Sequence, residues 1–402
     1  MKYIFFFKKI SDFDHLLPLV INLLNKGVQY NEIKLIELYP DLTLSYIEKD
    51  FRYKILKEYK LNLEKSYIGK LFLKIIKLIN KLIYLIKVIK HPLIISKKIL
   101  LFLLTNFYKL RLNYIFKSYE IKKVITDHSN TPLDKKLIYL ANKYRISIYS
   151  LPHGTVLHNG YTNKSLHNIL FPKKNNDNNF TKVIYTNNYH LGLSKNKSNG
   201  SNNLILGSIR YSKEWVNFLK TRAKSNKINN RFIKVLIFEE KSGIKSEKQF
   251  IPWINQNEIQ NIINYLSKFN NCEIIVSKHP SIIENRLSSN PVNYHHNKST
   301  FEMVNDSDIV IGCLTSALCD AIVLNKRTIF LPYCHFFNNN LINILPQNYM
   351  AKSFEEFKKI FNDNINGIRN KNKVFFQKKF YKEFIKCDDS DIFENYNNLI
   401  NN

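Results

Sequence analysis

Two stretches of the chain pair a short apolar run with a polar cluster at its end. The first, CEIIVSKHP at 272–280, predicts a buried strand. The second, at 307–332, predicts a strand, a polar turn, a helix and a further strand. This alternation favours an α/β fold built on a parallel sheet. The polar residues that follow the two strands are Lys278, His279, Pro280, Thr315 and Ser316.

These polar residues fall where a parallel sheet binds its ligands, in the crevice outside the carboxyl ends of the strands. Lys278 and His279 supply positive charge and hydrogen-bond donors. Thr315 and Ser316 precede a helix whose first backbone N–H groups attract phosphate. The pattern predicts a pocket for a nucleoside mono- or diphosphate. A purely structural interpretation stays open, in which Pro280 ends a strand and the Thr-Ser pair caps a helix.

The first half of the chain also alternates apolar strands with helical spacing. Strands are predicted at 2–7, 32–38, 122–127 and 146–151. The last two of them end close to the candidate catalytic residues Asp127 and His153. A histidine near its unperturbed pKa can take a proton from a hydroxyl group at physiological pH, so His153 is the predicted general base. Alternatively, His153 only holds its loop together by hydrogen bonds.

The chain of 402 residues is long enough for two domains. A polar connection rich in Asn, Ser and Lys at 187–203 places the boundary between an N-terminal domain, 1–200, and a C-terminal domain, 201–385. The remaining residues, 386–402, form a predicted C-terminal tail, whose last residues, 395–402, are expected to be frayed.

Three further residues are candidates for the nucleotide-binding site. Arg210 lies near the domain boundary, where its guanidinium could meet a phosphate. The strand at 231–238 ends at Glu239, and Gly243 follows shortly after. A carboxylate there could act as a base or bind a ribose, but an exposed structural Arg and a solvated strand end are equally compatible with the sequence.

Charge and cysteine content narrow the function classes. A net charge of +29 attracts polyanions, which include nucleic acid, anionic membranes and phosphorylated substrates. The chain has none of the common nucleic-acid-binding signatures, so a nucleic-acid partner is not expected. Five scattered cysteines without CxxC pairs indicate free thiols in a reducing cytosol, and no metal site is predicted.

The segment 65–118 contains twelve Lys and Arg residues and no acidic residue. Its lysines recur every three or four residues between 70 and 81, and apolar residues occupy the opposite face of the predicted helix. The lysines interrupt any run long enough to cross a membrane. The pattern predicts basic amphipathic helices at the surface of an anionic bilayer. Alternatively, these helices cover the core of the N-terminal domain and present a solvated lysine face.

Four short motifs resemble bacterial surface-polysaccharide glycosyltransferases of the GT-B type. More narrowly, they resemble the group of CDP-glycerol glycerophosphotransferase-like and capsule-polysaccharide transferases and, more distantly, the bacterial sialyltransferases that use CMP-activated sugars. The resemblance covers about 145–335. The motifs are PHG at 152–154, LGSIRYSKEW at 206–215, SKHP at 277–280 and SDIVIGCLTSALCDAIVLNKRTIFLPY at 307–333.

The resemblance implies two Rossmann-like domains that face each other across a cleft. The acceptor would lie mainly on the N-terminal domain and the nucleotide donor on the C-terminal one. His153 would be the base, while His279 and the Thr315–Ser316 pair would hold the donor phosphate. The stretch Glu239–Gly243 has one residue more than the acid-acid-x-Gly pattern of the sialyltransferases, so a sialic acid donor is not expected.

The sequence therefore predicts a transferase that needs no metal or other cofactor. It would move a sugar or polyol phosphate from a CMP- or CDP-linked donor to a membrane-associated glycan acceptor in surface polysaccharide biosynthesis. The predicted location is the cytoplasm, peripherally on the inner face of the cytoplasmic membrane. The alternatives are an enzyme similar to UDP-sugar epimerases and a non-catalytic scaffold that binds glycan or lipid.

Overall fold

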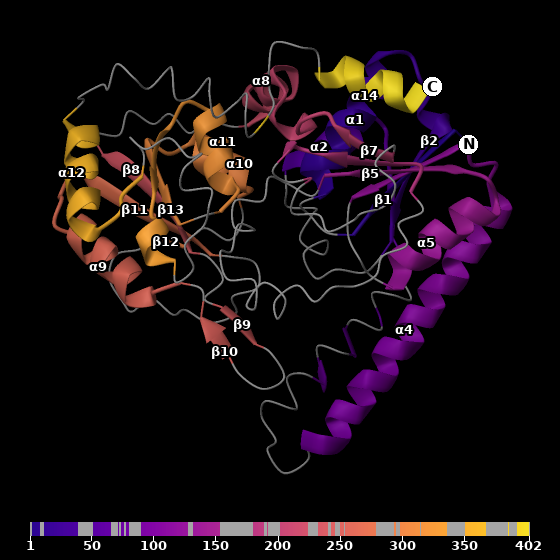
Figure 1. Ribbon diagram of the computed structural model, residues 1–402, viewed down its shortest axis with the longest axis horizontal. Helices are drawn as coiled ribbons and strands as arrows, with labels where there is room; N and C mark the ends of the chain where they lie inside the picture. The colour runs from indigo at the N-terminus through magenta and orange to yellow at the C-terminus, as the bar shows by residue number, and fades with distance from the viewer. Residues whose placement is uncertain are drawn as a thin grey trace.

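The computed structural model has two parallel β-sheets, each covered by helices (Figure 1). It describes residues 2–8, 12–38, 51–65, 71, 74–75, 78–79, 90–127, 132–152, 180–188, 191, 202–223, 232–239, 243–245, 250–252, 254–278, 293–294, 298–313, 315–335, 350–366, 385 and 392–401.

The first sheet has seven parallel strands in the order β3-β2-β1-β4-β5-β6-β7. The strands are β1 (Tyr3–Phe7), β2 (Ile33–Glu37), β3 (Leu63–Glu64), β4 (Lys123–Asp127), β5 (Ser147–Leu151), β6 (Lys182–Tyr185) and β7 (Asn203–Ile205). The helical segments of this part are α1 (Phe13–Asn25), η2 (Tyr30–Glu32), α2 (Phe51–Glu58), α4 (Lys90–Ser118) and α5 (Pro132–Lys143). The strands expected in the first half of the chain are confirmed.

Strand β1 shows why this sheet is buried on both faces. All five of its residues are buried, as expected for a strand covered by helices on each side. Successive side chains point to opposite faces, so Phe5 and Phe7 join the core under α1, whereas Ile4 and Phe6 join the core under α4 and α5. The continuous apolar run at the start of the chain therefore serves two cores.

The second sheet has five parallel strands in the order β12-β11-β8-β13-β14. They are β8 (Ile233–Glu239), β11 (Cys272–Lys278), β12 (Asn293–Tyr294), β13 (Ile309–Gly312) and β14 (Arg327–Phe330). An antiparallel pair, β9 (Gly243–Lys245) and β10 (Phe250–Pro252), stands apart. The helical segments of this part are α9 (Gln256–Leu266), α10 (Thr300–Asn305), α11 (Ala317–Val323), η6 (Pro332–Cys334) and α12 (Phe354–Ile365).

Helices also cover both faces of the second sheet. Residues of α9 and α12 share one core with it, and residues of α10 and α11 share the other. The α/β class and the two Rossmann-like domains predicted from the sequence are thus confirmed.

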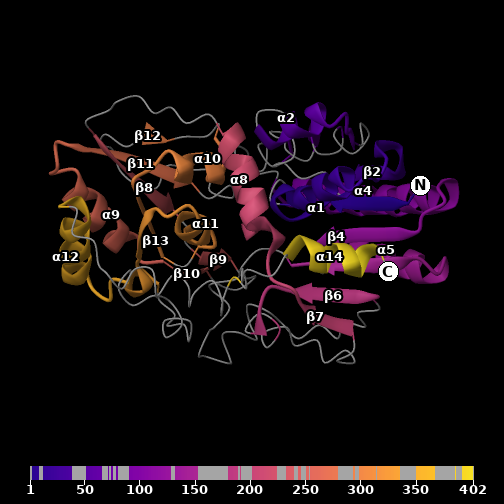
Figure 2. The same cartoon turned by 90° about the horizontal axis from the view of Figure 1, so that it is seen from above.

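Three helical segments join the two domains. They are η5 (Ile209–Tyr211), α8 (Lys213–Arg222) and the C-terminal α14 (Ile392–Asn401). One apolar core runs through residues of both sheets, α8 and α14, so the domains share packing. Figure 2 shows α14 lying over the first domain, far from the α12 that precedes it among the described helices.

The prediction of a frayed C-terminal tail is wrong for the described residues. Residues 392–401 form α14, which packs against α1. Asn22 Nδ2 donates to Asn397 Oδ1 at 2.9 Å, and the Tyr396 hydroxyl donates to the carbonyl oxygen of Gly207 at 2.8 Å. The many Asn residues of this stretch suggested a solvated end, but its apolar residues recur at helical spacing and are buried.

Replacing Tyr396 by Phe is expected to lower the free energy of unfolding by about 1–3 kcal/mol, because it leaves a buried carbonyl without its donor. Urea unfolding measures this loss. Tyr139→Phe is the matched control, since Tyr139 is exposed on α5. Equal unfolding free energies for the two variants would show that the contact with Gly207 does not hold α14 in place.

Candidate functional site

Strand order identifies the place in each sheet where a ligand crevice opens. In the first sheet the order reverses between β1 and β4, and in the second it reverses between β8 and β13. Neighbouring connections leave on opposite faces at such a switch point, which opens a crevice at the carboxyl edge. The residues that follow these four strands are therefore the first candidates for a site.

At the first switch point, the side chain of Lys8 is surrounded by carboxylates. Lys8 directly follows β1, and Asp127 ends β4. The Lys8 ammonium forms an ion pair with Asp127 and lies 2.6 Å from Asp134 Oδ1 at the start of α5. The backbone N–H of Lys8 also donates to Asp12 Oδ2 at 2.6 Å. A buried lysine and three buried aspartates thus gather at this edge.

The carboxylates keep Lys8 charged despite its burial. Burial alone would lower the pKa of this amine, but attraction to Asp127, Asp134 and Asp12 outweighs it, and the pKa lies above its usual value. Asp127 therefore enters the site as a carboxylate already paired with a cation. The catalytic role that the sequence suggests for Asp127 stays a prediction.

The register of β5 places the strand that leads to His153 beside Asp127. Asp127 pairs with Leu151, the last residue of β5, and His153 follows two positions later. His153 itself lies outside the described residues. Because His153 comes two residues after the end of β5, we expect it at the same sheet edge. Its role as a base stays a prediction.

In the second sheet, Glu239 lies at the switch point and Lys278 ends the strand one place away from it, so both lie at the carboxyl edge. Lys278 pairs in register with Glu239, so β11 and β8 end side by side. Glu239 is buried, and Gly243 begins the short strand β9 a few residues later. His279 and Pro280 lie outside the described residues.

Thr315 and Ser316 follow β13 at this edge, as the sequence predicts. Both side chains are half-buried, and Thr315 Oγ1 accepts from the backbone N–H of Ala317 at 3.3 Å. Gly312 makes room for this turn, because a Cβ atom there would lie 3.2 Å from Thr315 Cγ2. The turn is therefore packed closely against the end of its strand.

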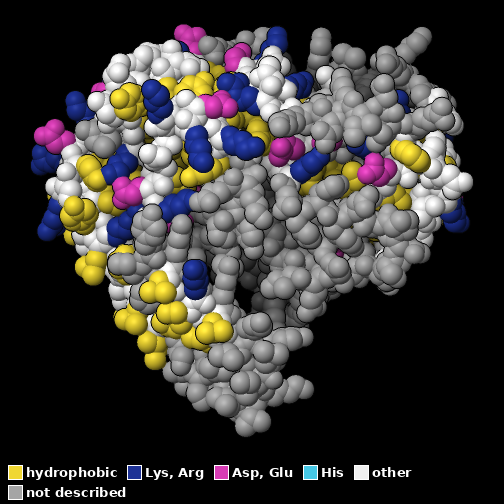
Figure 3. Space-filling model, turned by 180° about the vertical axis from the view of Figure 1, so that it is seen from behind, with side chains coloured by type: hydrophobic (Ala, Val, Ile, Leu, Met, Phe, Trp, Pro, Cys, Tyr) yellow, Lys and Arg dark blue, Asp and Glu magenta, His cyan; other side chains and the backbone are white. Residues whose placement is uncertain are grey.

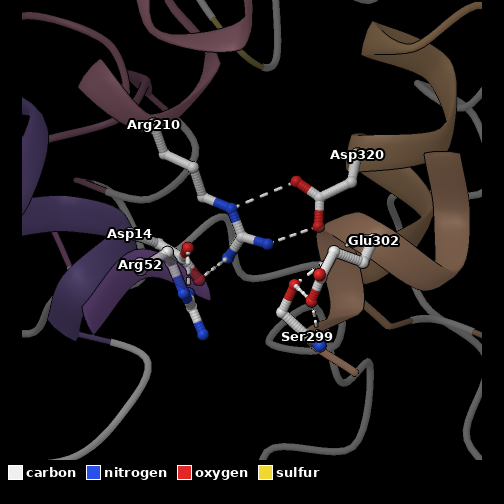
Figure 4. A network of polar contacts seen from close by, with 6 residues as sticks. All are labelled: Asp14, Arg52, Arg210, Ser299, Glu302 and Asp320. Atoms are coloured by element: carbon white, nitrogen blue, oxygen red, sulfur yellow. Dashed lines mark hydrogen bonds and ion pairs between the residues drawn. The ribbon is translucent and has the colours of Figure 1, made fainter. Parts of the chain in front are cut away.

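Arg210 lies at the boundary between the domains, as the sequence suggests, and its guanidinium is paired with aspartates from both sides (Figure 4). Its Nε donates to Asp320 Oδ1 at 3.1 Å and its Nη2 pairs with Asp320 Oδ2, while Nη1 lies 3.2 Å from Asp14 Oδ2. Asp14 also pairs with Arg52 of α2. Two arginines and two aspartates thus form a neutral group in which Asp14 and Arg52 come from the first domain and Asp320 comes from the second. Contact of Arg210 with a donor phosphate stays a prediction.

The two aspartates of this group differ in pKa because they have different numbers of cationic partners. Burial would raise the pKa of Asp14, but Arg210 and Arg52 together outweigh it and lower that pKa. Burial raises the pKa of Asp320 to about 6, and repulsion from Asp14 adds to the rise, because the attraction of Arg210 does not outweigh them. Asp320 is therefore the member of the group that takes up a proton first on acidification.

The paired residues Lys8, Asp14, Arg52 and Asp320 were not among the candidates drawn from the sequence. The sequence around two of them, Lys8 and Asp320, has features that could have identified them. Lys8 follows five buried strand residues, and Asp320 interrupts the apolar helix ALCDAIV. A charge inside an apolar element needs a partner. Among the described residues, no group of His, Cys, Asp and Glu could hold a metal ion.

Comparison with known proteins identifies the fold. No family model and no curated protein sequence matches the chain. Among solved structures, UDP-GlcNAc 2-epimerase from Methanocaldococcus jannaschii, in complex with UDP-GlcNAc and UDP, is 10% identical with a TM-score of 0.58, covering 100% of this chain and 99% of that one. A variant of the wall teichoic acid polymerase TagF is 12% identical with a TM-score of 0.54, covering 100% and 88%. The chain thus has the GT-B fold.

Asp320 gives a specific pH dependence of stability. Its pKa rises from 3.8 to about 6 on folding, so the folded protein binds the extra proton within this window. The free energy of unfolding should therefore fall as the pH rises from 3.8 to about 6, by at most about 3 kcal/mol from this group. Asp320→Asn removes the titration.

Urea unfolding of the wild type and Asp320→Asn at several pH values measures the effect. The stability of the wild type relative to the variant should decrease with rising pH across the window. Asp14 contributes the opposite slope only below its ordinary pKa, because its pKa is lowered. A difference between the two proteins that stays constant or grows with pH would contradict the raised pKa.

Proposed function

We propose that this protein is a transferase that moves a sugar or polyol phosphate from a nucleotide-activated donor to a membrane-associated glycan acceptor in surface polysaccharide biosynthesis. The observation that carries the proposal is that polar residues follow the strands at the carboxyl edges of two parallel sheets. Residues 1–200 would bind the acceptor and residues 201–385 the donor, with a CMP- or CDP-linked donor favoured by the resemblance of the motifs.

The donor phosphate would lie at the carboxyl edge of the second sheet. Lys278 and His279 would supply positive charge from β11 on one side of β8, and the Thr315–Ser316 turn follows β13 on the other side. Glu239 ends the central strand of the same edge, where a carboxylate could bind the ribose hydroxyls. These groups would stabilise the negative charge that develops on the departing nucleotide phosphate.

The acceptor hydroxyl would lie at the carboxyl edge of the first sheet. His153 would take the hydroxyl proton while the oxygen attacks the activated carbon or phosphorus of the donor. The bond to the nucleotide phosphate then breaks, and the phosphate leaves with the bonding electrons. Asp127 ends the neighbouring strand, and its carboxylate would favour the protonated form of His153.

A second candidate is a UDP-sugar epimerase, favoured by the likeness of the whole fold to UDP-GlcNAc 2-epimerase. The two activities differ in their need for an acceptor. An epimerase isomerises the sugar while it is held by the enzyme, whereas a transferase releases the nucleotide only when a hydroxyl group accepts the sugar or polyol phosphate. The preferred nucleotide also separates the two, because the transferase proposal favours cytidine and the epimerase uridine.

A thermal-shift panel of CMP, CDP, UDP, GDP and their common sugar and polyol conjugates tests the donor site. A ligand of the folded state stabilises it by about 2.7 kcal/mol at a hundredfold excess over its Kd. We expect a cytidine-selective shift that His279→Ala removes. A uridine-selective shift would support the epimerase instead. No shift with any nucleotide would contradict both enzymes and leave a glycan- or lipid-binding scaffold.

His153→Ala is the matched variant for the acceptor side. It should keep the nucleotide shift and lose turnover, measured as nucleotide release from the conjugate that binds when a glycan acceptor is present. Loss of the shift together with turnover would show that His153 serves the donor pocket or the fold, which would contradict its assignment as a base.

The proposed membrane contact is supported by the outward face of α4. This helix buries Leu104, Tyr108 and Leu112 against the first sheet. On its other side, large apolar residues recur at helical spacing and are exposed, and Figure 3 shows apolar side chains gathered over this helix at the lower left. The exposed residues are Ile99, Phe102, Leu103, Leu110 and Tyr114.

The charge of the surrounding segment favours an anionic bilayer as the partner of this face. The segment 65–118 carries only basic charges, and a bilayer with anionic headgroups offers both the apolar layer and the opposite charge. Leu71, Ile75 and Leu78 of the same segment are also exposed, which agrees with contact rather than with a cover over the core. No helix in the described ranges is long and apolar enough to cross a membrane.

Polar substitutions on this face are expected to weaken binding to vesicles. Phe102 and Leu110 are 66% and 67% exposed, so Phe102→Ser and Leu110→Ser should leave the free energy of unfolding nearly unchanged. Each would remove about 1.5–3 kcal/mol of apolar burial in a bilayer, which corresponds to roughly a tenfold or greater loss of affinity. Sedimentation with phosphatidylglycerol vesicles measures the loss, and phosphatidylcholine vesicles test the charge requirement.

Tyr139→Ser is the control for this experiment, because Tyr139 is exposed on α5 of the same domain and is not part of the apolar face of α4. Equal binding by all three variants, or equal binding to neutral and anionic vesicles, would contradict the membrane proposal.

A further inference from the structure

The group around Arg210 connects the two domains through one side chain. Arg210 belongs to η5, which follows the last strand of the first sheet and precedes α8. One edge of its guanidinium binds Asp320 of α11, and the remaining nitrogen faces Asp14 of α1. The same cation therefore compensates one carboxylate from each domain.

Each of these carboxylates lies in the first turn of the helix that follows a switch-point strand: α1 follows β1, and α11 follows β13. Asp14 lies in the first turn of α1, six positions after Lys8, and Asp320 lies five positions after Thr315. Because α1 and α11 both start at carboxyl edges, a bridge between the two carboxylates holds those edges at a set separation. The aromatic pair Phe51 and Phe301, with ring centroids 6.3 Å apart, packs across the same boundary.

A second contact ties η5 to the candidate donor cluster itself. The hydroxyl of Tyr211 donates to the carbonyl oxygen of Ser316 at 3.3 Å. Arg210 and Tyr211 are adjacent, so η5 holds α11 both at the residue before its first turn and at Asp320. Any rotation of the second domain relative to η5 must break these contacts together.

The surroundings of the bridge make separation costly. Asp14 and Asp320 are buried, and the Arg210 side chain is 11% exposed. The other residues that line the small cavity here are apolar: Val216, Leu219, Phe301, Val323 and Leu324. These side chains offer no replacement partner, so opening the domains leaves a buried carboxylate without its cation until water enters.

We propose that Arg210 is a positioning residue that sets the separation of the two domains. It would thereby hold the carboxyl edge of the second sheet, where the donor would bind, at the right distance from the carboxyl edge of the first sheet, where the acceptor would bind. The catalytic part of this assignment rests on the proposed transferase function, whereas the control of domain separation does not. Arg210 would then act on the donor through α11 rather than by direct contact.

Small-angle X-ray scattering without any nucleotide tests the bridge. Asp14→Asn and Asp320→Asn each remove one arm, so each should increase the radius of gyration and the maximum dimension of the folded protein. The double variant should show no further increase, because both substitutions break the same bridge. Circular dichroism confirms folding. If an Asn variant fails to fold, Arg210→Lys retains the charge without the planar fork.

Arg222→Lys is the matched control. Arg222 lies on α8 and pairs with Glu58 of α2 at 3.2 Å, but both side chains are substantially exposed. Its scattering should match the wild type, because exposed pairs contribute little. Unchanged scattering in the Asp14, Asp320 and Arg210 variants would overturn the proposal, as would an equal change in Arg222→Lys.

Turnover separates this proposal from the transferase assignment. With the conjugate that binds in the thermal-shift panel, Arg210→Lys should lower kcat at least tenfold and change nucleotide affinity less than threefold. If the wild type releases no nucleotide from any conjugate in the presence of a glycan acceptor, the transferase assignment fails while the scattering result still decides the bridge. Altered scattering with normal kcat would overturn the positioning role.

Discussion

Parallel strand pairing is the constraint on which the candidate site depends. Because all strands within each sheet run in one direction, the residues that follow them collect at a single edge, and the strand order selects one gap at that edge. Lys8 and Asp127 border this gap in the first sheet, and Glu239 and Gly312 border it in the second. The faces of both sheets are buried, so the polar residues that could bind a ligand lie at these edges.

The buried charges at the boundary between the two domains compensate one another. The group of Arg210, Arg52, Asp14 and Asp320 has no net charge, and it lies where the two domains meet. Asp14 pairs with both Arg210 and Arg52, whereas Asp320 pairs with Arg210. This difference explains why the pKa of Asp14 is lowered while that of Asp320 is raised. A boundary built this way is stable only when both domains are in place, since each side brings carboxylates that the shared arginine must neutralise.

The strands and the polar residues at their ends were predictable from the sequence, because an apolar run and the polar residues that end it lie close together in the chain. The ion pairs were not, because they join residues far apart in the chain: Arg210 and Asp320 are 110 positions apart, and Asp14 and Arg52 are 38 apart. Composition misled at the C-terminus, where Asn-rich sequence suggested fraying. The spacing of Ile392, Tyr396 and Ile400 at every fourth position carried the signal for α14, since these residues form its buried face.

Helix α4 shows how one element links the core to the proposed membrane surface. A helix that only covers a sheet needs one apolar face, but α4 has a second one turned outward. Arg111 ties the helix to the sheet, because its guanidinium donates to the carbonyl oxygen of Glu37 at 2.7 Å and lies 3.2 Å from the Glu64 carboxylate. Under the proposed contact, a bilayer that holds α4 would thereby also orient the first sheet and its acceptor edge relative to the membrane.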